Sequence, residues 1–139
     1  MMIQAHQDNI PPGAGIIVVR KFSGKYKVLA LEINGMLDIP KGGIDPGETA
    51  LQAAIRETSE EAGITNLNFL WGMQFHEYSK LTTFIAETDQ DPIILPNPHT
   101  GILEHDSAQW VEWNILYGNT KPFIKPAVTW AKGIIERTT

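Results

Sequence analysis

Hydrophobic residues in the first forty positions come in short runs separated by turn signals. Residues 15–20 (GIIVVR) and 26–33 (YKVLALEI) are rich in β-branched and aliphatic side chains, and Ser23-Gly24 lies between them. This arrangement predicts two antiparallel strands joined by a tight turn. Asn34-Gly35 is a further turn signal, so residues 36–39 are expected to form a third, short strand.

A helical pattern follows. Thr49-Ala50-Leu51-Gln52 has the form of a capping box, so a helix is expected to begin near Thr49, and Gly63 is typical of its C-terminal cap. Glu57, Glu60 and Glu61 have the i, i+3, i+4 spacing that places side chains on one side of a helix. The residues expected to pack on the core lie on another side: Leu51, Ala54, Ile55, Thr58 and Ala62.

The second half of the chain predicts strands at residues 67–76, 81–87 and 109–113. Residues 89–103 are rich in Pro, Asn, Asp and Gly and are expected to form a loop, with 93–95 as a candidate edge strand. A second helix should run from Pro122 or Pro126 to Arg137, with an inward face of Ile124, Val128, Ala131, Ile134 and Ile135. The pattern predicts one α/β domain over residues 1–139, a mixed sheet flanked by helices.

The three clustered glutamates carry the clearest chemical signal. Like charges at this spacing repel one another and destabilise a bare helix. A bound cation would turn this repulsion into a net attraction. Ligands that are all oxygen suit Mg²⁺ or Mn²⁺ rather than zinc. Taken alone, the cluster favours a solvated acidic helix face, which is common in soluble proteins.

A longer motif surrounds these glutamates: Gly42-x5-Glu48-x7-Arg56-Glu57-x2-Glu60-Glu61-x-Gly63-Ile64. It resembles the Nudix box, the signature of the Nudix hydrolases, with Thr58 where that family usually has an aliphatic residue. The resemblance implies the Nudix fold, a mixed sheet sandwiched between helices. It also implies a Mg²⁺-dependent or Mn²⁺-dependent pyrophosphohydrolase that cleaves nucleoside diphosphate-linked substrates.

The same resemblance assigns roles within the box. Glu57, Glu60 and Glu61 are expected to bind the metal, with a backbone carbonyl near Lys41 or Gly42 completing the shell. Arg56 is expected to orient Glu48 and Glu57. The general base is either a box glutamate, Glu60 or Glu61, or a glutamate from a distant loop, for which Glu104 is the candidate.

Three further segments resemble the asymmetric diadenosine tetraphosphate hydrolases: Pro40-Lys41-Gly42, Arg56-Glu57-Thr58, and Glu104-His105 followed by Trp110. That subgroup often has a tryptophan at the position of Leu37. The resemblance implies cleavage of diadenosine tetraphosphate to ATP and AMP. Lys41 and His105 are then expected to contact phosphate or base, with Lys80 a weaker candidate.

An adenine ring needs an aromatic or apolar slot, and one segment supplies candidates for it. Phe75, His76 and Tyr78 lie together near a predicted strand end, and Tyr78 and His76 are the expected substrate contacts, with Tyr78 favoured. His6 and His99 belong to no motif and are expected to be surface residues.

Charge and composition narrow the partners. The formal charge is −5 without a basic stripe, which argues against nucleic-acid partners apart from a single phosphorylated RNA 5′ end. The chain has no cysteine, which excludes disulfides and thiolate zinc sites. Residues 1–8 resemble no signal peptide and no run could span a bilayer, so a cytoplasmic protein with a small nucleotide substrate and no membrane partner is expected.

Three alternatives to the dinucleotide substrate stay open. The first is another Nudix activity, on ADP-ribose, a nucleoside triphosphate or an RNA 5′ end. The second is a diphosphoinositol hydrolase, although such an anionic substrate would call for a Lys/Arg-lined pocket that the sequence does not indicate. The third is a nucleotide-binding module that has lost catalysis, although no box carboxylate is missing. The oligomeric state is not indicated.

Overall fold

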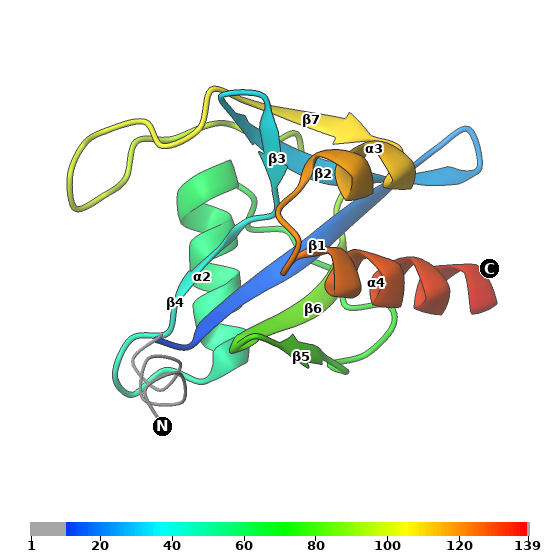
Figure 1. The fold of residues 1–139 in the computed structure, drawn as a ribbon, viewed down its shortest axis with the longest axis horizontal. Helices are drawn as coiled ribbons and strands as arrows, with labels where there is room; N and C mark the ends of the chain where they lie inside the picture. Colours follow the sequence, from blue (N-terminus) through cyan, green and yellow to red (C-terminus); the bar gives the residue numbers. More distant parts are fainter. Residues whose placement is uncertain (1–10, 139) are drawn as a thin grey trace.

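One long strand, β1 (Gly13–Phe22), lies at the centre of the sheet (Figure 1). The structure is a computed structural model that describes residues 11–138. The remaining elements, in chain order, are β2 (Lys25–Ile33), β3 (Met36–Asp38), β4 (Lys41–Gly43), α2 (Ala50–Ala62), β5 (His76–Tyr78), β6 (Leu81–Glu87), β7 (Ser107–Val111), α3 (Trp113–Asn119) and α4 (Lys125–Arg137).

The sheet is mixed, and β1 organises it. The strand order is β3-β2-β1-β6-β5, with β4 paired to β1 and β7 paired to β2. The first half of β1 pairs antiparallel with β4, its second half pairs antiparallel with β2, and β6 runs parallel along its other edge. β1 therefore fixes the position of β4, the strand that begins the Nudix-like motif.

Alternation along the strands separates two cores. Ile16 and Val18 of β1 pack with the buried alanines of α2, whereas Ile17 and Val19 pack with the apolar side of α4. Because successive strand side chains point to opposite faces, α2 and α4 cover the two faces of the sheet. The predicted inward face of α4 is buried at all five positions, and Pro126 lies in the first turn of that helix, as expected.

Most elements of the first half are confirmed. Both predicted turns form, with positive φ at Ser23-Gly24 and at Asn34-Gly35, as two-residue turns between antiparallel strands require. The helix begins after Thr49 and ends at Gly63 as predicted. Ile55 departs from the prediction, because it is 38% exposed rather than in the core.

The predictions for the second half are wrong in three places. Residues 67–75 form no strand beyond one bridge at Asn68, because Gly72 turns the chain with φ +80°, and only the last residue of the predicted range, His76, lies in a strand, β5. Residues 93–95 form no strand, since the Ile93 N–H donates to the Ala62 carbonyl at the end of α2. The strand expected at 109–113 stops at Val111, and Trp113 begins α3, a helix with one buried residue and therefore no periodic signal.

No helix among the described residues is both long enough and apolar enough to cross a bilayer.

We predict that Gly15→Ala destabilises the fold. A Cβ at residue 15 would lie 2.6 Å from the Pro40 carbonyl oxygen and 2.7 Å from the Lys41 Cβ, so the β1–β4 pair would have to separate. Overpacking of this kind costs about 1–3 kcal/mol. Thermal or urea unfolding measures the loss. Gly43→Ala is the matched control, because nothing lies within 4 Å of its Cβ position; equal midpoints for the two variants would contradict the prediction.

Candidate functional site

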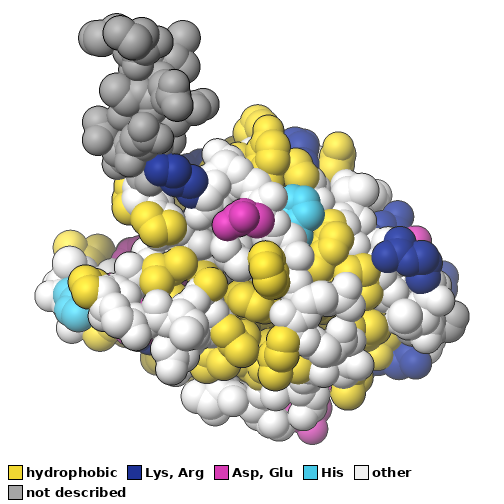
Figure 2. Space-filling model, turned by 90° about the horizontal axis from the view of Figure 1, so that it is seen from below, with side chains coloured by type: hydrophobic (Ala, Val, Ile, Leu, Met, Phe, Trp, Pro, Cys, Tyr) yellow, Lys and Arg dark blue, Asp and Glu magenta, His cyan; other side chains and the backbone are white. Residues whose placement is uncertain are grey.

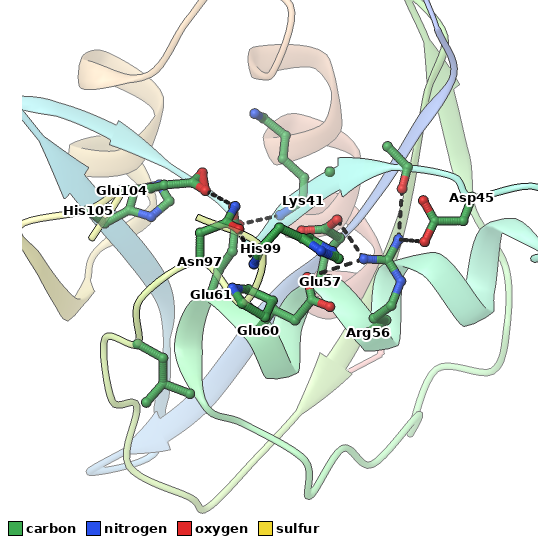
Figure 3. A pocket seen from close by; sticks show the side chains of 14 residues that line it. Lys41, Asp45, Arg56, Glu57, Glu60, Glu61, Asn97, His99, Glu104 and His105 are labelled. Carbon is green, nitrogen blue, oxygen red and sulfur yellow. Dashed lines mark hydrogen bonds and ion pairs between the residues drawn. The ribbon is translucent and has the colours of Figure 1, made fainter. Parts of the chain in front are cut away.

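Helix α2 is fixed at both ends, and this fixes the direction of its glutamates. At the N-terminus the Gln52 N–H donates to Thr49 Oγ1 (3.1 Å) and the Thr49 N–H donates to Gln52 Oε1 (2.9 Å), a complete capping box. At the C-terminus Gly63 adopts a left-handed conformation with φ 66°. Glu57, Glu60 and Glu61 consequently point together into one pocket (Figure 3).

Strand β4 runs so close to this helix that a side chain at residue 42 would have to displace the Glu57 carboxylate. A Cβ there would lie 2.1 Å from the carboxyl carbon of Glu57, and both carboxylate oxygens of Glu57 would be within 2.4 Å. The Glu57 carboxylate thus occupies the space that a side chain at residue 42 would take. The missing side chain of Gly42 is part of the site.

The Arg56 guanidinium joins the turn to the helix. It binds both Glu48 oxygens, from Nε (2.7 Å) and Nη2 (3.0 Å), and Nη2 also donates to the Gly43 carbonyl (2.9 Å). Nη1 donates to Glu57 (3.0 Å) and Glu60 (3.2 Å). These bonds raise the pKa of Arg56 and lower the pKa of Glu48. The predicted orienting contacts of Arg56 to Glu48 and Glu57 are present, and Glu60 is added to them.

Glu61 is the most buried acid of the group. Its Oε1 accepts the Lys41 N–H (3.0 Å), and burial, assisted by repulsion from Glu57, raises its pKa to about 8. Burial also raises the pKa of Glu57, although Arg56 opposes that change. Among the described residues Glu61 has no side chain of opposite charge within ion-pair distance. A buried carboxylate in this position would be stabilised by a cation.

Alternation along β4 decides which backbone carbonyl faces the glutamates. The Pro40 carbonyl accepts from Ile16, and Ile44 donates to Pro12, so residues 40, 42 and 44 turn their backbone groups toward β1. The Lys41 N–H instead donates to Glu61, so the carbonyl of Lys41 also points away from β1, toward the glutamates. Of the two carbonyls that the sequence left open, the geometry favours Lys41 over Gly42.

The loop between β6 and β7 closes the pocket. The predicted loop after β6 is tied to the end of α2, where the Ile93 N–H donates to Ala62 (2.8 Å) and Gln90 Nε2 donates to the Gly63 carbonyl (3.0 Å). Farther along it, Glu104 and His105 line the pocket opposite α2 (Figure 3). Burial lowers the pKa of His105, so its imidazole favours the neutral form.

The pocket has a volume of about 270 Å³ and gathers most of the predicted residues. Those that line it are Lys41, Gly42, Arg56, Glu57, Glu60, Glu61, Glu104 and His105. The Lys41 ammonium forms an ion pair with Asp38 (3.0 Å), so it would have to leave this partner, or share it, to contact a phosphate.

Two predicted substrate contacts lie outside this pocket. His76 is in β5, where its ring packs 5.6 Å from the Trp130 ring of α4, and its Nδ1 is buried without a hydrogen-bond partner. Tyr78 is 52% exposed at the end of the same strand, directly before Ser79 and Lys80. Neither is brought to the carboxylates.

Sequence reasoning also missed lining residues. His99, predicted to be a surface residue, is exposed and lines the pocket, and Asn97 lines it beside Glu104. Neither belongs to a motif; the only hint was the length of the loop, because long loops in small domains tend to be functional. The prediction for His6 lies outside the described residues.

The donor set fits a hard divalent cation. It consists of three carboxylates and a backbone carbonyl, and among the described residues it includes no sulfur ligand. As the side chains stand, no three acidic or histidine residues among positions 11–138 are grouped tightly enough to ligate one ion. The hydrogen bonds explain this, since Arg56 holds Glu57 and Glu60 while the Lys41 N–H holds Glu61. Cation binding would therefore require these carboxylates to turn.

Comparison with known proteins gives a consistent result. The pattern of the NUDIX domain matches residues 10–132. The bis(5′-nucleosyl)-tetraphosphatase [asymmetrical] of Caenorhabditis elegans is 35% identical over 106 residues, which cover 70% of this chain and 74% of the relative. The NAD-capped RNA hydrolase NudC of Salmonella agona is 32% identical over 108 residues, 76% of this chain but 38% of the relative.

A solved structure supports the same conclusion. The crystal structure of a C. elegans Ap4A hydrolase binary complex matches with a TM-score of 0.72 and 26% identity, covering 91% of this chain and 98% of that one. The sheet and helices described above are thus arranged as in that structure.

We predict that Gly42→Ala weakens Mn²⁺ binding by about tenfold or more, since changes even to groups that only orient metal ligands typically cost 10–100-fold in affinity. The new methyl group would expel the Glu57 carboxylate from the space it occupies. Calorimetric titration with Mn²⁺ measures the affinity, and circular dichroism checks the fold. Gly43→Ala, the next residue of the same strand, should bind Mn²⁺ like the wild type. Equal affinities for the two variants would show that Glu57 is not a ligand.

Proposed function

This chain belongs to the Nudix family and is a pyrophosphohydrolase, and we propose that it cleaves dinucleoside polyphosphates, diadenosine tetraphosphate foremost, to ATP and AMP. The observation that carries this proposal is a second pocket that adjoins the first. Lys41, Gly42 and Gly43 line both pockets, and the second also has Lys80 and Phe123 in its wall and a volume of about 230 Å³. A substrate with two nucleoside ends joined by a long phosphate chain could occupy both pockets at once.

The second pocket supplies the groups that one end of such a substrate requires. Phe123 offers a half-buried aromatic ring, with the Lys41 ammonium 5.7 Å from its centroid, and Lys80 adds a second cation. An adenine can stack on an aromatic face while lysines contact its phosphates. Tyr78, which directly precedes the pocket residues Ser79 and Lys80, remains a proposed contact.

Nudix hydrolases generally use divalent metal ions, and we assign Mg²⁺ to this one, with Mn²⁺ as a substitute. Glu57, Glu60, Glu61 and the Lys41 carbonyl would hold the ion, for the reasons of charge and direction given above. When bound, it neutralises phosphate charge and makes the phosphorus easier to attack.

The chain's own residues would carry the remaining steps. A carboxylate takes the proton from the attacking water, the new P–O bond forms, and the phosphoanhydride P–O bond breaks with its electron pair on the leaving phosphate. We assign this role to Glu104, because it lines the pocket across from the α2 glutamates and is not among the proposed ligands. Arg56 serves by holding Glu57 and Glu60 in place.

Other Nudix substrates would appear as the preferred member of the substrate panel described below. The similarity to an NAD-capped RNA hydrolase keeps an RNA 5′ end among them.

We predict that Glu61→Gln lowers kcat by about 10²-fold or more, since it removes a ligand charge at the reacting phosphates. The fold should be preserved, because a glutamine can accept the Lys41 N–H as Glu61 does and burial already disfavours the charged form. Steady-state kinetics with Mg²⁺ and thermal unfolding measure the two effects. Glu136→Gln, an exposed glutamate of α4, controls for charge. A near-normal rate for Glu61→Gln would remove it from the metal site.

The substrate is tested by product analysis on a panel with Mg²⁺. The panel contains diadenosine tetraphosphate, ADP-ribose, dGTP and its oxidised form, and NAD-capped and triphosphorylated RNA. We expect ATP plus AMP from the first compound at a rate well above the others. Preference for another member would keep the pyrophosphohydrolase and replace the substrate. Nucleotide binding without cleavage of any member would contradict the enzymatic proposal.

A further inference from the structure

Glu104 has no secondary structure to hold it in place. It lies in the segment between β6 and β7, which forms no helix or strand, and its side chain is exposed. The nearby α2 glutamates repel it, as the raised pKa of Glu57 in part reflects. A glutamate on a loop, repelled by its neighbours, would turn toward solvent unless another group retained it.

Asn97 is that group. Its Nδ2 donates to Glu104 Oε2, and the two side chains meet at the mouth of the pocket (Figure 3). The direction of the amide is set by its other end, since Oδ1 accepts the backbone N–H groups of His99 (2.8 Å) and Thr100 (3.2 Å). With its oxygen engaged by two donors, the amide can only present its NH₂ group to Glu104.

The backbone of Asn97 closes the same turn. Its N–H donates to the Ile102 carbonyl (2.8 Å), and its carbonyl accepts the Gly101 N–H (2.8 Å). The stems of the loop are anchored separately, at Ile93 on α2 and at Asp106, whose N–H donates to the Glu32 carbonyl (2.7 Å). The tip is therefore a small closed unit on fixed stems, and Asn97 alone connects that unit to the Glu104 side chain.

We propose that Asn97 is a positioning residue that holds Glu104 over the reacting phosphate, an inference that rests on the role of Glu104 in the proposed function. Its effect on catalysis passes entirely through Glu104. Without the amide donor the turn can still close, but the carboxylate loses the bond that offsets repulsion from α2.

Asn97→Asp separates the two functions of the side chain. An aspartate keeps an oxygen for the His99 and Thr100 N–H groups, so the turn is preserved. It replaces the donor to Glu104 with a negative charge, so the two carboxylates repel each other. We expect kcat to fall about 10–100-fold, in the range typical for residues that orient a catalytic group, with KM changed by less than about threefold.

The matched control is Asn66→Asp. Asn66 Nδ2 donates to Asp89 Oδ1 (2.9 Å) at the stem of the same loop, outside the pocket, so this variant breaks an equivalent bond with the same change of charge. Its kcat should stay within about twofold of wild type, since exposed pairs contribute little.

A double-mutant cycle on whichever substrate the wild type cleaves tests the proposal. If Asn97 acts through Glu104, Asn97→Asp in the Glu104→Gln background should cost no further kcat, although each single variant is impaired. Amide hydrogen exchange at His99 and Thr100 should stay slow in Asn97→Asp. Additive losses, a normal kcat for Asn97→Asp, or a normal kcat for Glu104→Gln would each overturn the proposal. Inactivity of the wild type would instead overturn the proposed function.

Discussion

The structure depends on one unfavourable arrangement, five carboxylates, Asp45 among them, brought together around a pocket of about 270 Å³. Glu57, Glu60 and Glu61 share one side of α2, and Glu104 faces them from a loop. Arg56 offsets part of this repulsion, because a single guanidinium binds Glu57 and Glu60 on one side and the turn residue Glu48 on the other. The five donors of an arginine in a rigid plane make this possible, whereas a lysine could not hold three carboxylates in fixed directions.

Glu61 is the carboxylate of α2 that Arg56 does not bind, and this makes it suited to bind a cation. Burial raises the pKa of Glu61 to about 8, because its charged form has too little compensating charge within the protein. Arg56 does not compensate the Glu61 charge, because its guanidinium binds other partners. The group that donates to Glu61 is the neutral backbone N–H of Lys41. The site is thus complementary to a cation from outside the protein, and in the proposed function the substrate phosphates would meet Lys41 and Lys80 near the shared strand β4.

Local signals in the sequence predicted the elements that local interactions determine. The capping box at Thr49, the left-handed Gly63 and the turn at Asn34-Gly35 depend on neighbouring residues only, and all three are confirmed. The three glutamates converge because helical spacing alone brings them together. Failures occur where distant contacts decide: β4 forms because it pairs with β1, and residues 93–95 are held by the end of α2 instead of a strand. No pattern indicated that Asn97 would face Glu104.

Gly42 shows why part of a functional site stays hidden in a single sequence. Its place in the motif suggested that its backbone carbonyl binds the metal, but the pairing of β4 with β1 turns that carbonyl toward the sheet. Its contribution is the absent side chain, whose volume the Glu57 carboxylate fills. Sequence spacing can place a carboxylate on a side of a helix, yet only the distance between a strand and that helix decides how close it comes. Gly42 therefore contributes to the site by leaving room for the Glu57 carboxylate. The packing of β1, β4 and α2 thus helps to determine where that carboxylate lies.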